Sequence, residues 1–334
     1  MTQGRDSALL FSIPVGMPFL PGLAEALLSG RLIPGFPDAA DPLSLASATI
    51  YVPTRRAARE LRAAFAALGN PATVLLPVIR PLGEFDEDAA LFDPDPSPAL
   101  PPPVATIERV LLLAPLIRAW KQQIPRHVAA KFEGKVVVPA SSADAIWMAR
   151  ELAAFMDEAE TGGMSYAALA GLTQDSLAEW WQVTLDFLRI VTEHWPAILA
   201  QSNRSNPAVF RNAAIEAETA RLARNPAGGP VIVAGSTGSI PAIAGLIAAI
   251  VRLPNGCAVL PGLSMPGELG EEAWQRLSAP LPDPSDFGHP QFGLAKLLRA
   301  IGFVREDVME LGAPAPALAA RSRLIAGALL PAGS

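Results

Sequence analysis

The sequence has few residues of the kinds that build metal sites or a strong electrostatic field. Cys257 is its only cysteine among 334 residues, which excludes an internal disulfide and any multi-cysteine metal site. The three histidines (His127, His194 and His289) lack the spacing of metal ligands. Charged residues make up only 17%, and the formal net charge is −6. No global basic field therefore attracts nucleic acid, and any DNA contact must be local.

A secretory signal peptide is not recognisable at the N-terminus. Arg5 is offset by Asp6, and the apolar stretch that follows is interrupted by Pro14, Pro18 and Pro21. Together with the single cysteine, this pattern fits a reducing compartment. We therefore expect a cytoplasmic protein.

A membrane span needs separate consideration, because hydrophobic residues make up 51% of the chain. The longest uncharged run lies between Arg224 and Arg252 and is long enough to cross a bilayer. Residues 235–241 (GSTGSIP) interrupt it with glycines, hydroxyl residues and Pro241. A strand, a turn and then a helix with Pro241 in its first turn are a better interpretation. We expect no membrane contact.

Several catalytic patterns are also missing. The chain has neither a Gly-x-Ser-x-Gly sequence nor an intact dinucleotide fingerprint. Glu133-Gly134-Lys135 is superficially similar to the Glu-x-Lys of metal-dependent nucleases, but the nearest upstream aspartates, Asp93 and Asp95, lie in a proline-rich linker. EFDED at 84–88 is interpreted as an acidic turn, and Trp180-Trp181 as part of a helical core.

What the chain does have is an alternation of apolar strands and amphipathic helices. Strands are predicted at 8–13, 48–53, 73–79, 231–235 and 257–263, with helices after most of them. Such alternation predicts a parallel, doubly wound α/β sheet. Residues 1–100 form its first half, and helical patterns dominate residues 101–227 as an insertion subdomain. Residues 228–334 resume the α/β domain, which we expect to be truncated at its C-terminus.

The first turn, IPVGMPFLPG, has the layout of a phosphate-binding loop without its chemistry. A working loop needs glycines to wrap the phosphates, a lysine for the β- and γ-phosphates and a Ser or Thr for magnesium. Gly16 stands for a loop glycine, but Phe19 and Leu20 fall where the lysine and the hydroxyl residue belong. Two interpretations stay open: an ordinary strand–helix turn, or a nucleotide site that has lost its chemistry.

The second predicted helix, TRRAARELRAAFAAL, begins with positive charge where the helix dipole is already positive. Thr54 is a suitable N-cap, and Arg55 and Arg56 fall in the first turn. This placement costs a few tenths to about 1 kcal/mol per residue, and a nucleic-acid phosphate would reverse its sign. Thr54, Arg55, Arg56 and Arg59 are the candidate phosphate-binding residues. The alternative is a solvated arginine face in which Arg56 pairs with Glu60.

A third candidate segment follows the predicted strand VIVAG. A motor ATPase carries a magnesium-binding carboxylate at the end of such a strand. Here Ala234, Gly235 and Ser236 stand in that region. An ordinary turn of small residues between a strand and a helix is the favoured interpretation, and an anion nest is the alternative.

In their order along the chain these segments resemble the N-terminal part of the AddB family, the partner subunits of alphaproteobacterial AddAB helicase–nucleases. VPTRRAARELR and GSTGSIPA are the most specific parts of a resemblance that covers nearly the whole chain. It implies a RecA-like, superfamily 1 helicase-like sheet of the P-loop type with an all-helical insertion. It also implies degenerate ATPase motifs, an AddA-like motor subunit as partner, and single-stranded DNA held at Thr54, Arg55 and Arg56.

The family also implies groups that this chain does not contain. An iron–sulfur cluster and magnesium belong to a C-terminal nuclease domain, so we expect no cofactor, no metal site and no catalysis in this fragment. The expected role is a non-catalytic module in double-strand break repair that holds or scans the unwound strand. Two alternatives remain: an α/β enzyme that uses a nucleotide or small anion, and a protein-interaction scaffold without DNA binding.

Overall fold

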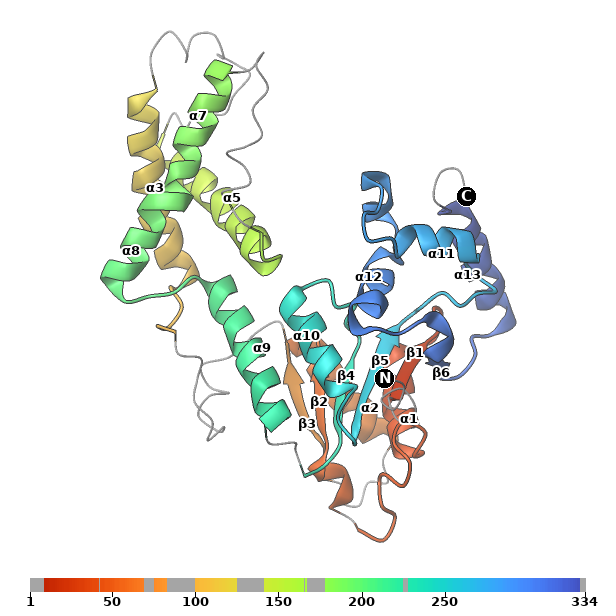
Figure 1. Cartoon of the computed structure of the whole chain (residues 1–334). Helices are drawn as coiled ribbons and strands as arrows, with labels where there is room; N and C mark the ends of the chain where they lie inside the picture. Colours follow the sequence, from red (N-terminus) through yellow and green to blue (C-terminus); the bar gives the residue numbers. More distant parts are fainter. Residues whose placement is uncertain are drawn as a thin grey trace. The chain divides into compact units, whose positions relative to one another are not determined.

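A computed structural model describes residues 9–41, 43–68, 75–82, 100–124, 141–164, 166, 178–224 and 228–330 (Figure 1). The chain divides into two compact units, Met1–Pro94 with Ile215–Ser334, and Asp95–Ala214. The chain returns from the second unit to the first inside helix α9 (Pro207–Arg224). The sequence pattern predicts this boundary after the helix, at residue 227. The reason is packing, since Ile215 and Leu222 of this helix belong to the core of the first unit.

In the described residues of the first unit, six parallel strands form one sheet, which confirms the predicted α/β class. Its strands are β1 (Leu9–Ile13), β2 (Thr49–Val52), β3 (Val78–Pro81), β4 (Val231–Ala234), β5 (Gly256–Pro261) and β6 (Met309–Glu310). Their spatial order is β3-β2-β4-β5-β1-β6, with every pairing parallel. All four residues of β4 are buried, as expected for an apolar strand in the middle of a parallel sheet.

Alternating residues of the strands point to opposite faces of the sheet and pack into two separate hydrophobic cores. Phe11, Ile50, Ile232 and Val259 face one core, which helices α1 (Phe19–Leu28) and α2 (Arg55–Leu68) cover. Residues of the opposite parity face a second core. It is covered by α9 and by three further helices, α10 (Pro241–Ile250), α11 (Glu271–Leu277) and α12 (Phe292–Ile301).

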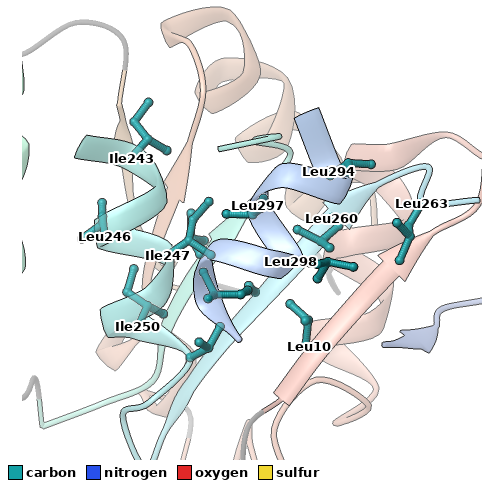
Figure 2. Packing of buried hydrophobic residues seen from close by; sticks show 14 of the residues in the cluster. Leu10, Ile243, Leu246, Ile247, Ile250, Leu260, Leu263, Leu294, Leu297 and Leu298 are labelled. Atoms are coloured by element: carbon teal, nitrogen blue, oxygen red, sulfur yellow. The ribbon is translucent and has the colours of Figure 1, made fainter. Parts of the chain in front are cut away.

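Figure 2 shows this second core from close by. Leu246 and Ile247 of α10 and Leu297 of α12 meet over the sheet, with Leu260 of β5 and Leu10 of β1 beneath. Each fully buried aliphatic side chain of this kind contributes about 1.5–3 kcal/mol relative to an exposed one. The two helices are therefore held against this face of the sheet.

Two strands differ from the sequence-based prediction. The run expected at 73–79 forms a strand only from Val78, because Pro77 lacks the N–H that a ladder requires. Val78 N instead starts the pairing by donating to Ala48 O at 2.9 Å. Residues 73 and 74 lie outside the described part of the chain. The two-residue strand β6 was not predicted, since it is too short to show a periodic pattern.

The long uncharged run forms β4, a turn and α10, as predicted. Pro241 occupies the first turn of α10, and the helix ends at Ile250. Ten residues span about 15 Å, half of the hydrocarbon thickness of a bilayer. In the described residues, no helix has both the length and the apolar character that a membrane crossing needs.

The second unit is helical. It contains α3 (Thr106–Gln123), α5 (Ser142–Thr161), α7 (Ala178–Arg189), a π-helical turn (Ile190–His194) and α8 (Trp195–Ser202). Ser141 and Asp144 form a capping box at the start of α5. Trp195 is buried, and its Nε1 donates to Asn206 Oδ1 at 3.2 Å. The last helix of the chain, α13 (Pro316–Ala328), belongs to the first unit and buries none of its residues.

Candidate functional site

The first turn, IPVGMPFLPG, forms a tight turn between β1 and α1. Met17 N donates to Pro14 O at 3.2 Å, and Gly16 adopts φ +92°, a conformation that side chains rarely tolerate. Phe19 and Leu20 are the first two residues of α1, where a phosphate loop presents its lysine and its hydroxyl residue. Both side chains are half-buried and pack against the core beneath α1 and α2.

The ring of Phe19 reaches the carboxyl end of β4. A methyl group on Gly235 would lie 3.1 Å from Phe19 Cε1 and 3.5 Å from Pro53 Cδ. The structure thus brings together three segments that the sequence singled out: the first turn, the end of β2 beside Thr54, and the end of β4. Gly235 can approach the ring this closely because it has no side chain and adopts φ +78°.

The remaining residues at the end of β4 are occupied within their own loop. Ala234 is fully buried, and Ser236 Oγ accepts from Gly238 N at 3.2 Å. Gly238 is backed by Leu297, whose Cδ1 would lie 2.6 Å from an added methyl group. The turn is therefore shaped by packing against α12.

Ligands of open α/β sheets bind where neighbouring strands send their helices to opposite faces. Among the described elements, the sheet has two such places, between β2 and β4 and between β5 and β1. The first contains the Phe19 ring. At the second, a methyl group on Gly262 would lie 2.6 Å from Val15 Cγ2, so the two turns touch. Side chains of the first turn thus occupy both places with apolar atoms.

The C-terminal segment closes over the same turn. Added methyl groups on Gly16 and Gly312 would lie 3.2 Å from Leu318 Cβ and 2.6 Å from Met17 Cε, respectively. No charge is supplied by the candidate residues of the first turn (Gly16, Phe19 and Leu20). The same is true of those at the end of β4 (Ala234, Gly235 and Ser236). An apolar contact of this kind joins loops but has nothing to neutralise a polyphosphate.

The candidate phosphate-binding residues lie at the start of α2. Thr54 caps the helix as predicted, its Oγ1 accepting from Ala57 N at 3.1 Å. Arg55, Arg56 and Arg59 are exposed, and no acidic residue stands in the first turn. Backbone N–H groups and three guanidinium groups therefore lie within two turns of one helix.

Arg56 and Arg62 of α2 each make a hydrogen bond within the first unit. Arg56 Nε lies 2.8 Å from Glu60 Oε1, and this hydrogen bond raises the pKa of the guanidinium. The pair anticipated as the alternative interpretation is thus present, although Arg56 remains 82% exposed. Arg62, one turn further on, donates to Ile79 O at 3.2 Å and fastens α2 to β3.

The sequence did not reveal the polar groups that hold the turn after β5. Ser12 is fully buried, and its Oγ accepts from Leu263 N at 3.0 Å. Gln291 accepts from Ser264 N at 3.0 Å and donates to Gly262 O at 2.9 Å. Gln291 immediately precedes α12. A lone serine and a lone glutamine carry no pattern from which these roles could be predicted.

The histidines and the cysteine considered in the sequence do not form a common site within the residues that the structure describes. In the described part of the chain, no group of three or more His, Cys, Asp or Glu side chains is arranged to hold a metal ion. Burial lowers the pKa of His289, and it raises the pKa of the Cys257 thiol. His194 lies in the π-helical turn. Several residues considered in the sequence lie outside the described part of the chain: residues 84–88, Asp93, Asp95, His127 and residues 133–135. The side chains of Trp180 and Trp181 are likewise not described.

Comparison of the chain with protein-family models, with curated proteins and with solved structures gave no match.

Proposed function

We propose that this chain is a non-catalytic, helicase-like module that holds unwound single-stranded DNA within a double-strand break repair complex. The observation that carries the proposal is the Phe19 ring at the carboxyl edge of the sheet, packed against Gly235 and Pro53. In this proposal the ring fills the position at which a working ATPase holds a nucleotide phosphate. Exposed arginines begin the helix that leaves the same edge at Thr54.

The architecture supports a helicase-like origin. Six parallel strands carry helices on both faces, and the helical unit is inserted between β3 and β4. We interpret the sheet as RecA-like and of the P-loop type, in keeping with the resemblance to the AddB family. In that interpretation the first turn and the end of β4 are the former phosphate and magnesium positions.

The start of α2 supports the DNA-holding role. Two arginines in the first turn oppose the helix dipole, a cost that a bound phosphate would remove. The Arg56–Glu60 pair is exposed, and such pairs contribute about 0.2–1 kcal/mol at most. A phosphate can therefore displace Glu60 at little cost. Contacts of this kind position a strand without reading its sequence.

We expect the Arg55→Ala/Arg56→Ala variant to bind a labelled single-stranded oligonucleotide about tenfold more weakly than wild type at about 50 mM salt. Two phosphate contacts would be lost, so the slope of log K against log salt should become shallower by about 1.4. Fluorescence anisotropy at a series of salt concentrations measures both quantities. Conversely, Glu60→Gln removes the carboxylate that competes for Arg56 and should strengthen binding.

A matched control is Arg321→Ala/Arg323→Ala, which removes two exposed arginines from α13. This control has the same change in net charge and is expected to leave the affinity within about twofold of wild type. Equal affinities of wild type and Arg55→Ala/Arg56→Ala at low salt would refute the role of α2. Equal losses of affinity in the two double variants would mean that binding depends on the net charge and not on the position of the arginines.

A protein partner is a second component of the proposal. In the helical unit, α3 exposes Ile107 (76%) and Leu111 (58%), which share one face, and α5 exposes Trp147 (53%). Exposed apolar side chains that adjoin on one helix face, as Ile107 and Leu111 do, are typical of protein interfaces. We propose an AddA-like motor subunit as the partner, in the cytoplasm. The iron–sulfur cluster and magnesium of the family are proposed to belong to a nuclease domain outside this chain.

The same exposed side chains favour the scaffold alternative. A scaffold would bind the motor subunit through α3 and α5 and would not bind DNA. Co-purification of the two subunits, combined with no oligonucleotide binding by the complex at low salt, would favour this alternative over the DNA-holding module.

A further inference from the structure

A cavity of about 370 Å³ lies between α11 and α12, on the face of the sheet opposite α2. Leu277 at the end of α11, Phe287 and Phe292 line it, together with two prolines, Ala279 and two cationic side chains. This volume is at the lower end of the range for small-molecule sites, roughly 300–1,000 Å³. It is large enough for one aromatic ring and the group attached to it.

The aromatic part of the cavity is exposed to solvent. Phe287 is 56% exposed although its ring centroid lies only 5.2 Å from that of Phe292, with the two planes inclined by 51°. Phe292 is the first residue of α12 and is fixed by that helix. A fixed ring thus supports an exposed ring, an arrangement that presents a flat surface for stacking.

The cationic part lies along α12. Phe292, Lys296 and Arg299 are spaced by four and three residues and therefore share one side of the helix. Both cations are exposed, and Arg299 Nη1 donates to Ser278 O at 3.1 Å, which fixes the guanidinium at the rim. Lys296 and Arg299 thus place two positive charges beside the two rings.

None of the described residues that line the cavity is acidic. The nearest carboxylates in the sequence have other roles. Asp286 is buried and pairs with Arg276 Nε at 2.9 Å, and Asp283 accepts from Ser285 N at 2.8 Å at the start of the short helix Pro284–Gly288. The charge at the cavity therefore complements an anion.

We propose that this cavity, lined by Phe287, Phe292, Lys296 and Arg299, binds one nucleotide of single-stranded DNA. The base stacks on Phe287, and the adjoining phosphates contact Lys296 and Arg299. The inference rests on the proposed function and adds a second contact with the strand, separate from α2. The combination of an aromatic platform with neighbouring cations is the usual means by which proteins hold single strands without sequence preference.

The test compares two labelled probes of equal length, an oligothymidylate and an oligonucleotide made only of abasic sites. Phe287→Ala should weaken binding of the oligothymidylate about fivefold or more and leave the abasic probe unaffected, because only the first probe has bases to stack. Phe287→Trp should retain wild-type affinity, since a larger ring preserves the platform. Lys296→Ala/Arg299→Ala should weaken both probes and make the salt dependence shallower by about 1.4.

Equal affinity of Phe287→Ala and wild type for the oligothymidylate would overturn the inference. Full competition by free thymidine monophosphate at submillimolar concentration would also overturn it, since the site would then take a mononucleotide rather than a strand. The Arg55→Ala/Arg56→Ala variant separates this inference from the proposed function. If only Arg55→Ala/Arg56→Ala loses affinity, the cavity does not bind the strand. If only the cavity variants lose affinity, α2 does not bind it. Failure of wild type to bind either probe would overturn both.

Discussion

Replacing Arg305 with alanine is expected to lower the free energy of unfolding by about 2–5 kcal/mol. Arg305 is 1% exposed and begins the short helix Arg305–Asp307. Its Nη1 donates to Leu269 O and its Nη2 to Glu271 Oε2, both at 2.7 Å, and its guanidinium lies 4.6 Å from the centroid of the Trp274 ring. Alanine would leave a cavity, an unpaired buried carbonyl and an uncovered ring face, and urea denaturation measures the sum.

Glu271→Gln is the matched control at the other end of the same ion pair. The Glu271 side chain is 58% exposed, and glutamine keeps an oxygen that can accept from Arg305 Nη2, so this substitution should cost less than Arg305→Ala. Hydrogen bonds from Arg305 and Gln275 lower the pKa of Glu271 in the folded state. The stabilisation from this carboxylate is therefore present above its unfolded pKa and is lost as the pH falls through the folded pKa. Equal costs for Arg305→Ala and Glu271→Gln would contradict the buried-arginine account.

Gly256→Ala is expected to destabilise the sheet by about 3 kcal/mol or more. Gly256 begins β5, and an added methyl group would lie 1.8 Å from Ile250 O, the carbonyl of the last residue of α10. The obstacle is backbone, so no side-chain rotation can relieve the overlap. Either α10 or the start of β5 must shift, and both belong to the core shown in Figure 2.

The same substitution at Gly245 should have the opposite sign. Gly245 lies inside α10, and an added methyl group would meet no atom within 4 Å. Alanine in a helix interior is more stable than glycine by about 0.5–1 kcal/mol, so Gly245→Ala should raise the midpoint of urea unfolding. A similar destabilisation in both variants would mean that the contact between Gly256 and α10 is not what determines the cost.

Elements with strong periodicity were predictable from the sequence. VIVA, flanked by glycines and proline, indicated a buried strand, and TRRAARELRAAFAAL indicated a helix capped by Thr54, which the structure confirms. The start of β3 was misplaced, because an apolar run that contains a proline does not show where pairing begins. The π-helical turn at Ile190–His194 was read as ordinary helix, since its residues continue the same apolar pattern.

The candidate site was only partly predictable, because its contacts join segments far apart in the chain. The absence of lysine at Phe19 and of a carboxylate near Gly235 was visible in the sequence. The contact between these two positions was not, since it depends on the placement of β4 within the sheet. The packing of Leu318 against Gly16 is likewise a tertiary contact that the sequence does not show. The stacking surface at Phe287 lacked any sequence signal, because one phenylalanine in a proline-rich loop follows no period.

The central claim is that the chain holds a single strand while its former nucleotide site is filled by Phe19. The most direct test is fluorescence anisotropy of a labelled single-stranded oligonucleotide, titrated with the chain at about 50 and 200 mM salt, with and without ATP–magnesium. The account predicts binding that weakens with salt and has the same affinity with and without ATP–magnesium. A change in affinity on addition of ATP–magnesium, or no binding at either salt concentration, would contradict it.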